Sequence, residues 1–258
     1  MRAFSWPRRT APLQATLCRW TRSRSIAVAL GLLSLVCPHS CNAEGADGQD
    51  YLPLGPHFFA SASTGGPLNY RDIILSTAPS ASETVGATYG GFSVSFWNGT
   101  DLTDSGNHAF EALGTYSHKL PLVDLHLGGY WCSTSGSLDH RSSGIRFSAT
   151  SNTFRSAEIG LTFDQSFNGR DRTLGASGTK SVYHKGAVTV DLKASGTHWN
   201  YSGFSAGGIS GRVMITDQLS KHAAIHFFLG GIGSRVTRSE GQQSKGALIA
   251  GATISWSF

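Results

Sequence analysis

A histidine and a serine two positions apart are the one arrangement in this chain that could do hydrolytic chemistry. His140-Arg-Ser142 would place both side chains on one face of a strand, and Asn152 follows as a candidate orienting group. A histidine beside a serine can act as general base while the hydroxyl attacks an ester. With 10 His in a serine-rich chain, such a pair arises by chance. We therefore predict no catalytic residue and keep a lipid hydrolase using His140 and Ser142 as an alternative.

The other histidines and cysteines form no metal-binding pattern. His118, His126, His222 and His226 lack the paired spacing of zinc ligands, and the chain has no C-x-x-C or H-E-x-x-H motif. Cys132 is the only cysteine after residue 43, so we predict that it is a small apolar filler in a strand. The sequence predicts neither a metal nor a cofactor.

The first 43 residues have the composition of a signal peptide. Six arginines and no acidic residue precede an apolar run, and Cys41-Asn-Ala43 then resembles a cleavage site. The apolar run is too short to span a bilayer as a helix. Removing this segment leaves 15 basic residues (21 minus 6) against 16 acidic ones, so the mature chain is nearly neutral. That balance argues against a nucleic-acid partner.

A polar stretch from 44 to 67 follows, which we predict to be a periplasmic tether. From residue 68 onward, apolar and polar residues alternate, as in a β-strand with one apolar face. Val123, Leu125 and Leu127 share one face, for example, while Asp124 and His126 share the other. The pattern predicts strands at 68–76, 84–89, 92–98, 107–118, 123–132, 142–152, 156–166, 172–181, 186–196, 204–216, 222–236 and 245–258.

The connections between these strands favour a membrane barrel. Tight joints near 90–91, 119–122, 153–155, 182–185 and 217–221 alternate with longer polar segments at 77–83, 99–106, 133–141, 167–171, 197–203 and 237–244. Short turns at one end and longer loops at the other are typical of outer-membrane barrels. We predict an all-β, transmembrane, antiparallel up-and-down barrel of about twelve strands over 68–258. Ten strands stay open, because 84–89 and 92–98 are short for a membrane strand.

Strand-borne polar residues lie opposite the apolar face and would line the lumen of such a barrel. These residues are Glu111, Asp124, His126, Arg146, Glu158, Asp164, Asp191, Lys193 and Arg212. Five acids against three bases predict at most a slight cation preference. Aromatic residues near strand ends would form girdles at the bilayer interfaces: Trp97, Trp131, Phe163, Tyr183, Trp199 and Trp256. A soluble β-sandwich or ligand-binding barrel has the same periodicity and stays an alternative.

The last strand alternates from Leu248 to Phe258 and stops on an aromatic residue. Here the sequence resembles bacterial outer-membrane β-barrels. The resemblance implies that Trp256 and Phe258 belong to a C-terminal signal for the barrel-assembly machinery, and that lipid of the outer membrane surrounds the barrel.

Within that group the chain looks most like the proteobacterial putative-porin family of the TorF type. The residues that carry this resemblance are Gly90-Gly91 leading into 92–101, Glu111-Ala-Leu-Gly-Thr-Tyr116, and the terminal Ser255-Trp-Ser-Phe258. It implies a small porin or passive channel for small hydrophilic solutes. A non-conducting structural or adhesive barrel remains the alternative, and the sequence does not define an oligomeric state.

Overall fold

The computed structural model describes residues 55–136, 138–154, 157–201 and 203–258. The predicted signal peptide and residues 44–54 of the predicted tether lie outside the described residues. In the described part, no helix is long and apolar enough to cross a membrane. The strands are β1 (His57–Tyr70), β2 (Ile73–Tyr89), β3 (Phe92–Asp101), β4 (His108–Lys119), β5 (Val123–Thr134), β6 (His140–Phe154), β7 (Ala157–Ser166), β8 (Arg172–Lys185), β9 (Val188–Tyr201), β10 (Phe204–Ser220), β11 (Ala223–Arg238) and β12 (Gly241–Ser257).

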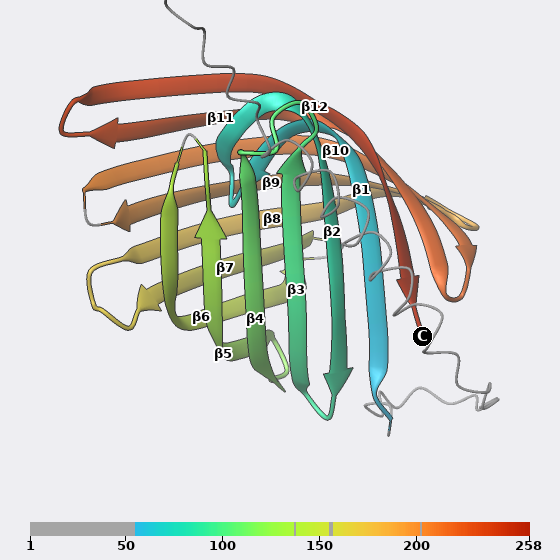
Figure 1. The fold of residues 1–258 in the computed structure, drawn as a ribbon. Coiled ribbons are helices and arrows are strands. Elements are labelled where there is room, and N and C mark those ends of the chain that lie inside the picture. The colour runs from blue at the N-terminus through green and yellow to red at the C-terminus, as the bar shows by residue number, and fades with distance from the viewer. Residues whose placement is uncertain (1–54, 137, 155–156, 202) are drawn as a thin grey trace, which may run out of the picture. The chain divides into compact units, whose positions relative to one another are not determined.

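These strands close into one antiparallel barrel (Figure 1). Each strand pairs with its neighbours in the sequence, and β12 returns to pair with β1. The seam is extended at the chain end, where the backbones of Phe58 and Phe258 exchange two hydrogen bonds of 3.1 and 2.8 Å. The predicted all-β, twelve-stranded up-and-down barrel is therefore confirmed.

The two ends of the barrel differ in their connections. At the end that we call the turn end, the connections are 90–91, 120–122, 155–156, 186–187 and 221–222. At the opposite end, the loop end, they are 71–72, 102–107, 135–139, 167–171, 202–203 and 239–240. His57 and Phe258 both lie at the turn end, because an even number of antiparallel strands brings the two ends of a barrel to the same side.

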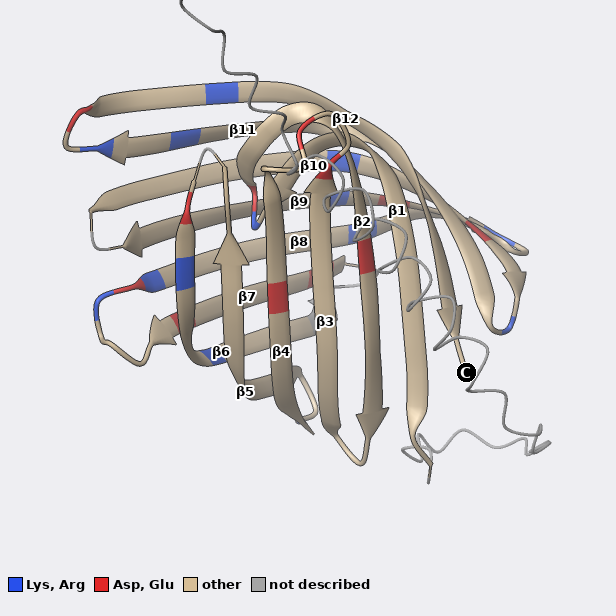
Figure 2. Cartoon of the chain, viewed as in Figure 1, with Lys and Arg blue, Asp and Glu red and all other residues tan. Residues whose placement is uncertain are grey.

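The outer face of the wall is apolar. Residues directly opposite each other on neighbouring strands share a face, and Phe147, Phe163 and Leu174 form one such outward row. Their exposed fractions are 45%, 42% and 59%. Figure 2 shows that charged residues occupy only scattered positions along the strands. Such a continuous apolar surface requires an apolar solvent, so the barrel is a transmembrane one and the soluble sandwich is wrong.

The start of the barrel differs from the prediction. The first strand begins at His57, so residues 57–67 belong to the barrel and not to a tether. The predicted strand 68–76 instead straddles the β1–β2 turn at Arg71 and Asp72, and the predicted connection 77–83 lies within β2. The small and hydroxylated residues of β1 have too weak a periodicity to be recognised as a strand.

Two of the predicted loops are also strand. Most of 197–203 belongs to β9, and most of 237–244 belongs to β11 and β12. Their polar residues stay paired in the ladder, as between Thr237 and Gln242. The polar residues indicated where these strands extend beyond the apolar outer face of the wall, but the strands continue past that point.

The end of the β1–β2 hairpin leaves the wall and folds into the barrel. β1 pairs with β12 only over 59–64, and β2 pairs with β3 only over 80–89. Between these ranges, residues 65–79 form what we call the inner hairpin. It begins at Gly65 and Gly66, whose φ angles are +109° and +66°. A Cβ atom at Gly65 would overlap the carbonyl oxygen of Ala250, so this bend needs glycine for both conformation and space.

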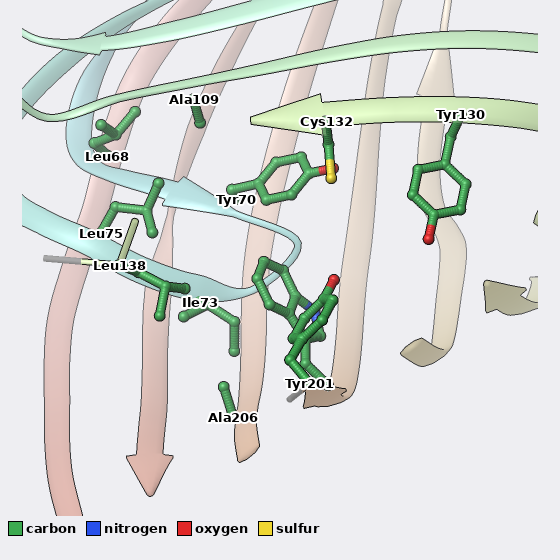
Figure 3. Close-up of a cluster of buried hydrophobic side chains, with 11 residues drawn as sticks. Leu68, Tyr70, Ile73, Leu75, Ala109, Tyr130, Cys132, Leu138, Tyr201 and Ala206 are labelled. Atoms are coloured by element: carbon green, nitrogen blue, oxygen red, sulfur yellow. The ribbon is translucent and has the colours of Figure 1, made fainter. Parts of the chain in front are cut away.

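The inner hairpin fills the loop half of the lumen with an apolar core (Figure 3). Leu68, Tyr70, Ile73 and Leu75 are buried against side chains from the surrounding wall. The wall contributes Ala109, Tyr130, Cys132, Trp199, Tyr201 and Ala206, and the β5–β6 connection contributes Leu138. The first hairpin of the barrel therefore occupies the lumen at the loop end.

Candidate functional site

Two arginines and two carboxylates form a closed network at the tip of the inner hairpin, which we call the ion quartet. Arg71 at the hairpin tip contacts Glu111 on β4 and Asp164 on β7, each at 2.5 Å. Arg146 on β6 contacts the same two carboxylates, each at 2.8 Å. Arg146 and Asp164 lie directly opposite each other in register, while Arg71 reaches them from across the lumen. The hairpin thus supplies the fourth member of a network whose other members belong to the wall.

The quartet is buried and internally balanced. Asp164 is only 1% exposed, and the side chains of the other three members are 12–14% exposed. Glu111 also accepts a hydrogen bond from the hydroxyl of Tyr70. Each carboxylate faces two guanidinium groups, so the cost of removing these charges from water is offset by attraction and by hydrogen bonds.

The next residue, Asp72, fastens the hairpin to the opposite side of the wall. Its carboxylate accepts hydrogen bonds from Ser195 (2.7 Å), Ser210 (2.8 Å) and Thr197 (3.2 Å) on β9 and β10. Arg71 and Asp72 have φ angles of 49° and 61°, as the two-residue turn requires. Arginine tolerates this region poorly, so the contacts on both walls compensate a backbone strain at the hairpin tip.

Aromatic and aliphatic contacts hold the flanks of the hairpin. The ring of Tyr70 stacks on Trp97 at 5.5 Å and meets the edge of Trp199 at 5.4 Å. Ile74 packs against Ile232 and Ile249. Trp97 and Trp199 therefore face the lumen, and their predicted place in an interfacial girdle is wrong. Trp131, Phe163 and Tyr183 are exposed, and Trp256 lies on the outward-facing alternate positions of β12.

Two polar cavities remain beside the hairpin. The first has a volume of about 250 Å³ and is lined by the ion quartet, Tyr70, Trp97 and residues of β7–β9. The second has a volume of about 430 Å³, and Lys193, Arg212 and His226 line it together with serine and threonine hydroxyls. We call the second one the basic cavity. The hairpin contacts β9 at Ser195 and β10 at Ser210. Lys193 and Arg212 lie two positions nearer to the turn end on the same two strands, so the basic cavity is on the turn side of the hairpin.

The structure groups the predicted lumen residues into distinct places. Glu111, Arg146 and Asp164 meet in the ion quartet, and Lys193 and Arg212 face each other in register on the wall of the basic cavity. The remaining four lie apart from these two groups. Asp191 accepts a hydrogen bond from Ser181, His126 bonds to Ser117, Asp124 lies opposite Lys119, and Glu158 lies opposite Thr179.

Sequence reasoning missed the residues that close the barrel, namely Tyr70, Arg71 and Asp72. One signal was available, since Ile73-Ile74-Leu75 is a continuous apolar run, and such a run indicates a strand buried on both faces. The hairpin adds one base and one acid to the lumen, Arg71 and Asp72, so the excess of acids over bases is unchanged. Two of those acids, Glu111 and Asp164, are matched by Arg71 and Arg146.

The candidate hydrolytic pair is not assembled. Ser142 lies 3.4 Å from both the Tyr130 hydroxyl and Asp171, while His140 packs its ring 4.0 Å from that of Tyr201. In the described part of the chain no hydrogen bond joins His140 to Ser142. Cys132 is a buried free thiol in the apolar core, near Tyr70 (Figure 3). Among the described residues, no group of three or more His, Cys, Asp or Glu could hold a metal ion.

A closed twelve-stranded barrel with an apolar outer face and charged residues inside is a transmembrane β-barrel. No protein-family model matches the sequence, and no curated protein matches it. Among solved structures, the chain is similar to the KdgM porin, with a TM-score of 0.51 and 11% identity over 78% of this chain and 99% of that chain. It is likewise similar to the KdgM porin in complex with disordered oligogalacturonate, with a TM-score of 0.50 and 12% identity over the same shares of both chains. At these identities, the likeness shows a common fold.

Proposed function

We propose that this protein is a small channel of the bacterial outer membrane for small hydrophilic solutes, and that its inner hairpin is the element that closes it. The observation that carries the proposal is the combination of an apolar outer wall with cavities beside the hairpin that are lined by charged and hydroxyl groups. The fold shared with the KdgM porin supports it. A channel needs no catalytic group, and the mechanism is diffusion through the lumen once the hairpin has left it.

The same proposal covers the place of the protein in the cell. The segment 1–43 would direct export, and the turn end would face the periplasm, as short turns do in bacterial barrels. Outer-membrane lipid would cover the apolar wall, and the strand that ends at Trp256 and Phe258 would be recognised by the barrel-assembly machinery. Membership in the TorF-type putative-porin family is part of this proposal and rests on the sequence motifs given above.

The hairpin has the features of a movable part. Its two ends join the wall at positions that face each other, since Thr64 pairs with Ala81. Its base contains Gly65 and Gly66, and its tip is attached by side chains, at the ion quartet and at Asp72. Moving it out would open the loop half of the lumen and leave the wall below Thr64 paired as before.

A locked hairpin and a shortened hairpin test this function together. In a Cys132→Ser background, Asp72→Cys with Ser210→Cys replaces a side-chain hydrogen bond by a disulfide between hairpin and wall. In a second variant, an Asn-Gly turn replaces residues 65–80, because a two-residue turn suits the facing partners Thr64 and Ala81. Single-channel conductance is then recorded in planar lipid bilayers for the unmodified chain, for the locked variant with and without reductant, and for the shortened variant.

We expect steady open steps from the shortened variant, brief steps from the unmodified chain, and steps from the locked variant only after reduction. Folding is checked by the shift in apparent size on unheated gels. If the folded and inserted shortened variant never conducts, the channel proposal fails and the structural or adhesive barrel takes its place. If the oxidised locked variant conducts like the unmodified chain, the hairpin is not the closing element.

A further inference from the structure

Lys193 and Arg212 are directly opposite each other on β9 and β10. Like charges in this position repel, and each such pair costs stability compared with neutral residues. The other lumen arginines, Arg71 and Arg146, are both matched by carboxylates. Lys193 and Arg212, in contrast, make no ion pair within 4.0 Å with any described carboxylate. Two opposed cations without a direct carboxylate partner are an arrangement that an anionic ligand would stabilise.

The surroundings of the pair form a site of suitable size and chemistry. Both side chains line the basic cavity, whose volume of about 430 Å³ accommodates a small organic molecule with its water. None of its lining residues is an aspartate or a glutamate. Hydroxyl groups face the same space and can bond to the oxygen atoms of a ligand; they belong to Ser61, Ser63, Ser80, Ser82, Thr253 and Ser255.

The nearest acids on the same inner face, Asp191 and Glu158, attract Lys193 from a distance but make no ion pair with it within 4.0 Å. Asp191 lies two positions from Lys193 on β9 and accepts a hydrogen bond of 2.6 Å from Ser181. Glu158 lies opposite Thr179, one strand beyond Lys193. His226 on β11 holds hydroxyl partners on both sides, Thr216 and Ser255, each at 2.9 Å. The cavity therefore presents two cations, a ring of hydroxyls and no carboxylate.

From this geometry we infer that Lys193 and Arg212 bind a small dianionic solute in the basic cavity, through two carboxylates or one phosphate group. Arg212 supplies a planar pair of donors for one anionic group, and Lys193 supplies a point charge beside it. The inference names the class of solute for the proposed channel. It rests on the proposed function only for how that solute reaches and leaves the cavity. Binding itself can be measured without conduction.

The test is ligand-observed NMR with the folded chain in a zwitterionic detergent, at low ionic strength. The probes are succinate and inorganic phosphate, with glucose and methylammonium as the neutral and cationic controls. The variants are Lys193→Gln, Arg212→Gln and the double variant. Lys245→Gln is the matched control, since it removes a cation of β12 that lines a separate small cavity near Ile73 and Ile74.

We expect succinate or phosphate to bind the unmodified chain and the Lys245→Gln variant alike, with glucose and methylammonium not binding. Each single variant should weaken binding roughly tenfold, and the double variant should abolish it. A preference between succinate and phosphate identifies the anionic group. Equal binding by the double variant, or no binding of either dianion by the folded chain, would overturn the inference. Conductance without dianion binding would leave the channel proposal standing.

Discussion

The guanidinium of Arg71 lies 2.5 Å from the carboxylate of Asp164, although the two residues are separated by 93 positions and Arg71 belongs to the first hairpin of the barrel. Arg146 faces the same carboxylate from a neighbouring strand at 2.8 Å. The wall thus carries one arginine and two acids, and the hairpin brings the missing positive charge. The ion quartet is therefore electrically balanced while the hairpin is in the lumen, and without the hairpin the wall would carry an excess of one acid at that position.

Arg71→Met should destabilise the barrel by roughly 3–5 kcal/mol, because it leaves two buried carboxylates with one arginine between them. The denaturant concentration at half-unfolding in detergent measures the effect. Arg172→Met is the control, since Arg172 is exposed and bonds only to Gln165 among the described residues. Equal changes in the two variants would show that the quartet contributes no special stability.

Gly65→Val should prevent the hairpin from bending inward. Valine avoids a φ of +109°, and its Cβ would overlap the carbonyl of Ala250, so we expect a cost of roughly 1–3 kcal/mol for the closed arrangement. Trypsin cleavage after Arg71, followed by mass spectrometry, reports whether the tip has become accessible. Gly114→Val is the control, because a Cβ at Gly114 meets no atom within 4 Å. A tip that stays protected in Gly65→Val would rule out this hinge.

Leu161→Arg should destabilise the barrel in lipid vesicles by roughly 2–4 kcal/mol, as charges on a lipid-facing wall do. Leu161 is 56% exposed on the outer face, so in a water-soluble barrel the same change would be nearly neutral. Ser177→Arg is the matched control, because Ser177 lies on the neighbouring strand and faces the cavity lined by the ion quartet. Unfolding by urea in vesicles gives both values. Similar costs for the two variants would contradict the assignment of outer and inner faces.

Lys193→Glu should raise stability while it removes dianion binding. The substitution turns a repulsive pair with Arg212 into an attractive one, which is worth roughly 0.2–1 kcal/mol across two strands. Half-unfolding in urea and succinate binding by NMR are measured on the same preparation. If binding were lost only because the fold is damaged, stability would fall. The sign of the change in stability therefore separates loss of the binding site from damage to the fold.

Much of the wall could be predicted from the sequence because each strand repeats one simple rule. Alternation placed Val123, Leu125 and Leu127 of β5 on one face and Asp124 and His126 on the other, and the paired register has the same arrangement. Parity along a strand depends only on the chain's own geometry, so no knowledge of distant partners was needed.

The inner hairpin could not be predicted in the same way, since the contacts that hold its tip are with β4, β7, β9 and β10, far along the chain. Tyr70 was missed because its partners, Trp97 and Trp199, were themselves assigned to the membrane interfaces by their position near strand ends. Likewise Lys193 and Arg212 were recognised as lumen residues, but their opposition depends on the register of β9 and β10. Register is set by turn lengths, and several of these were misjudged.

The anchors of the inner hairpin set an order of events during assembly. Asp72 bonds to Ser210 across 138 positions, and the backbone amide of Ile74 donates to Ser234 across 160 positions. The hairpin is synthesised before the later strands, but its partners Ser210 and Ser234 are in place only after β10 and β11 have joined the wall. The full set of contacts made by residues 65–79 therefore exists only in a barrel whose wall is nearly complete.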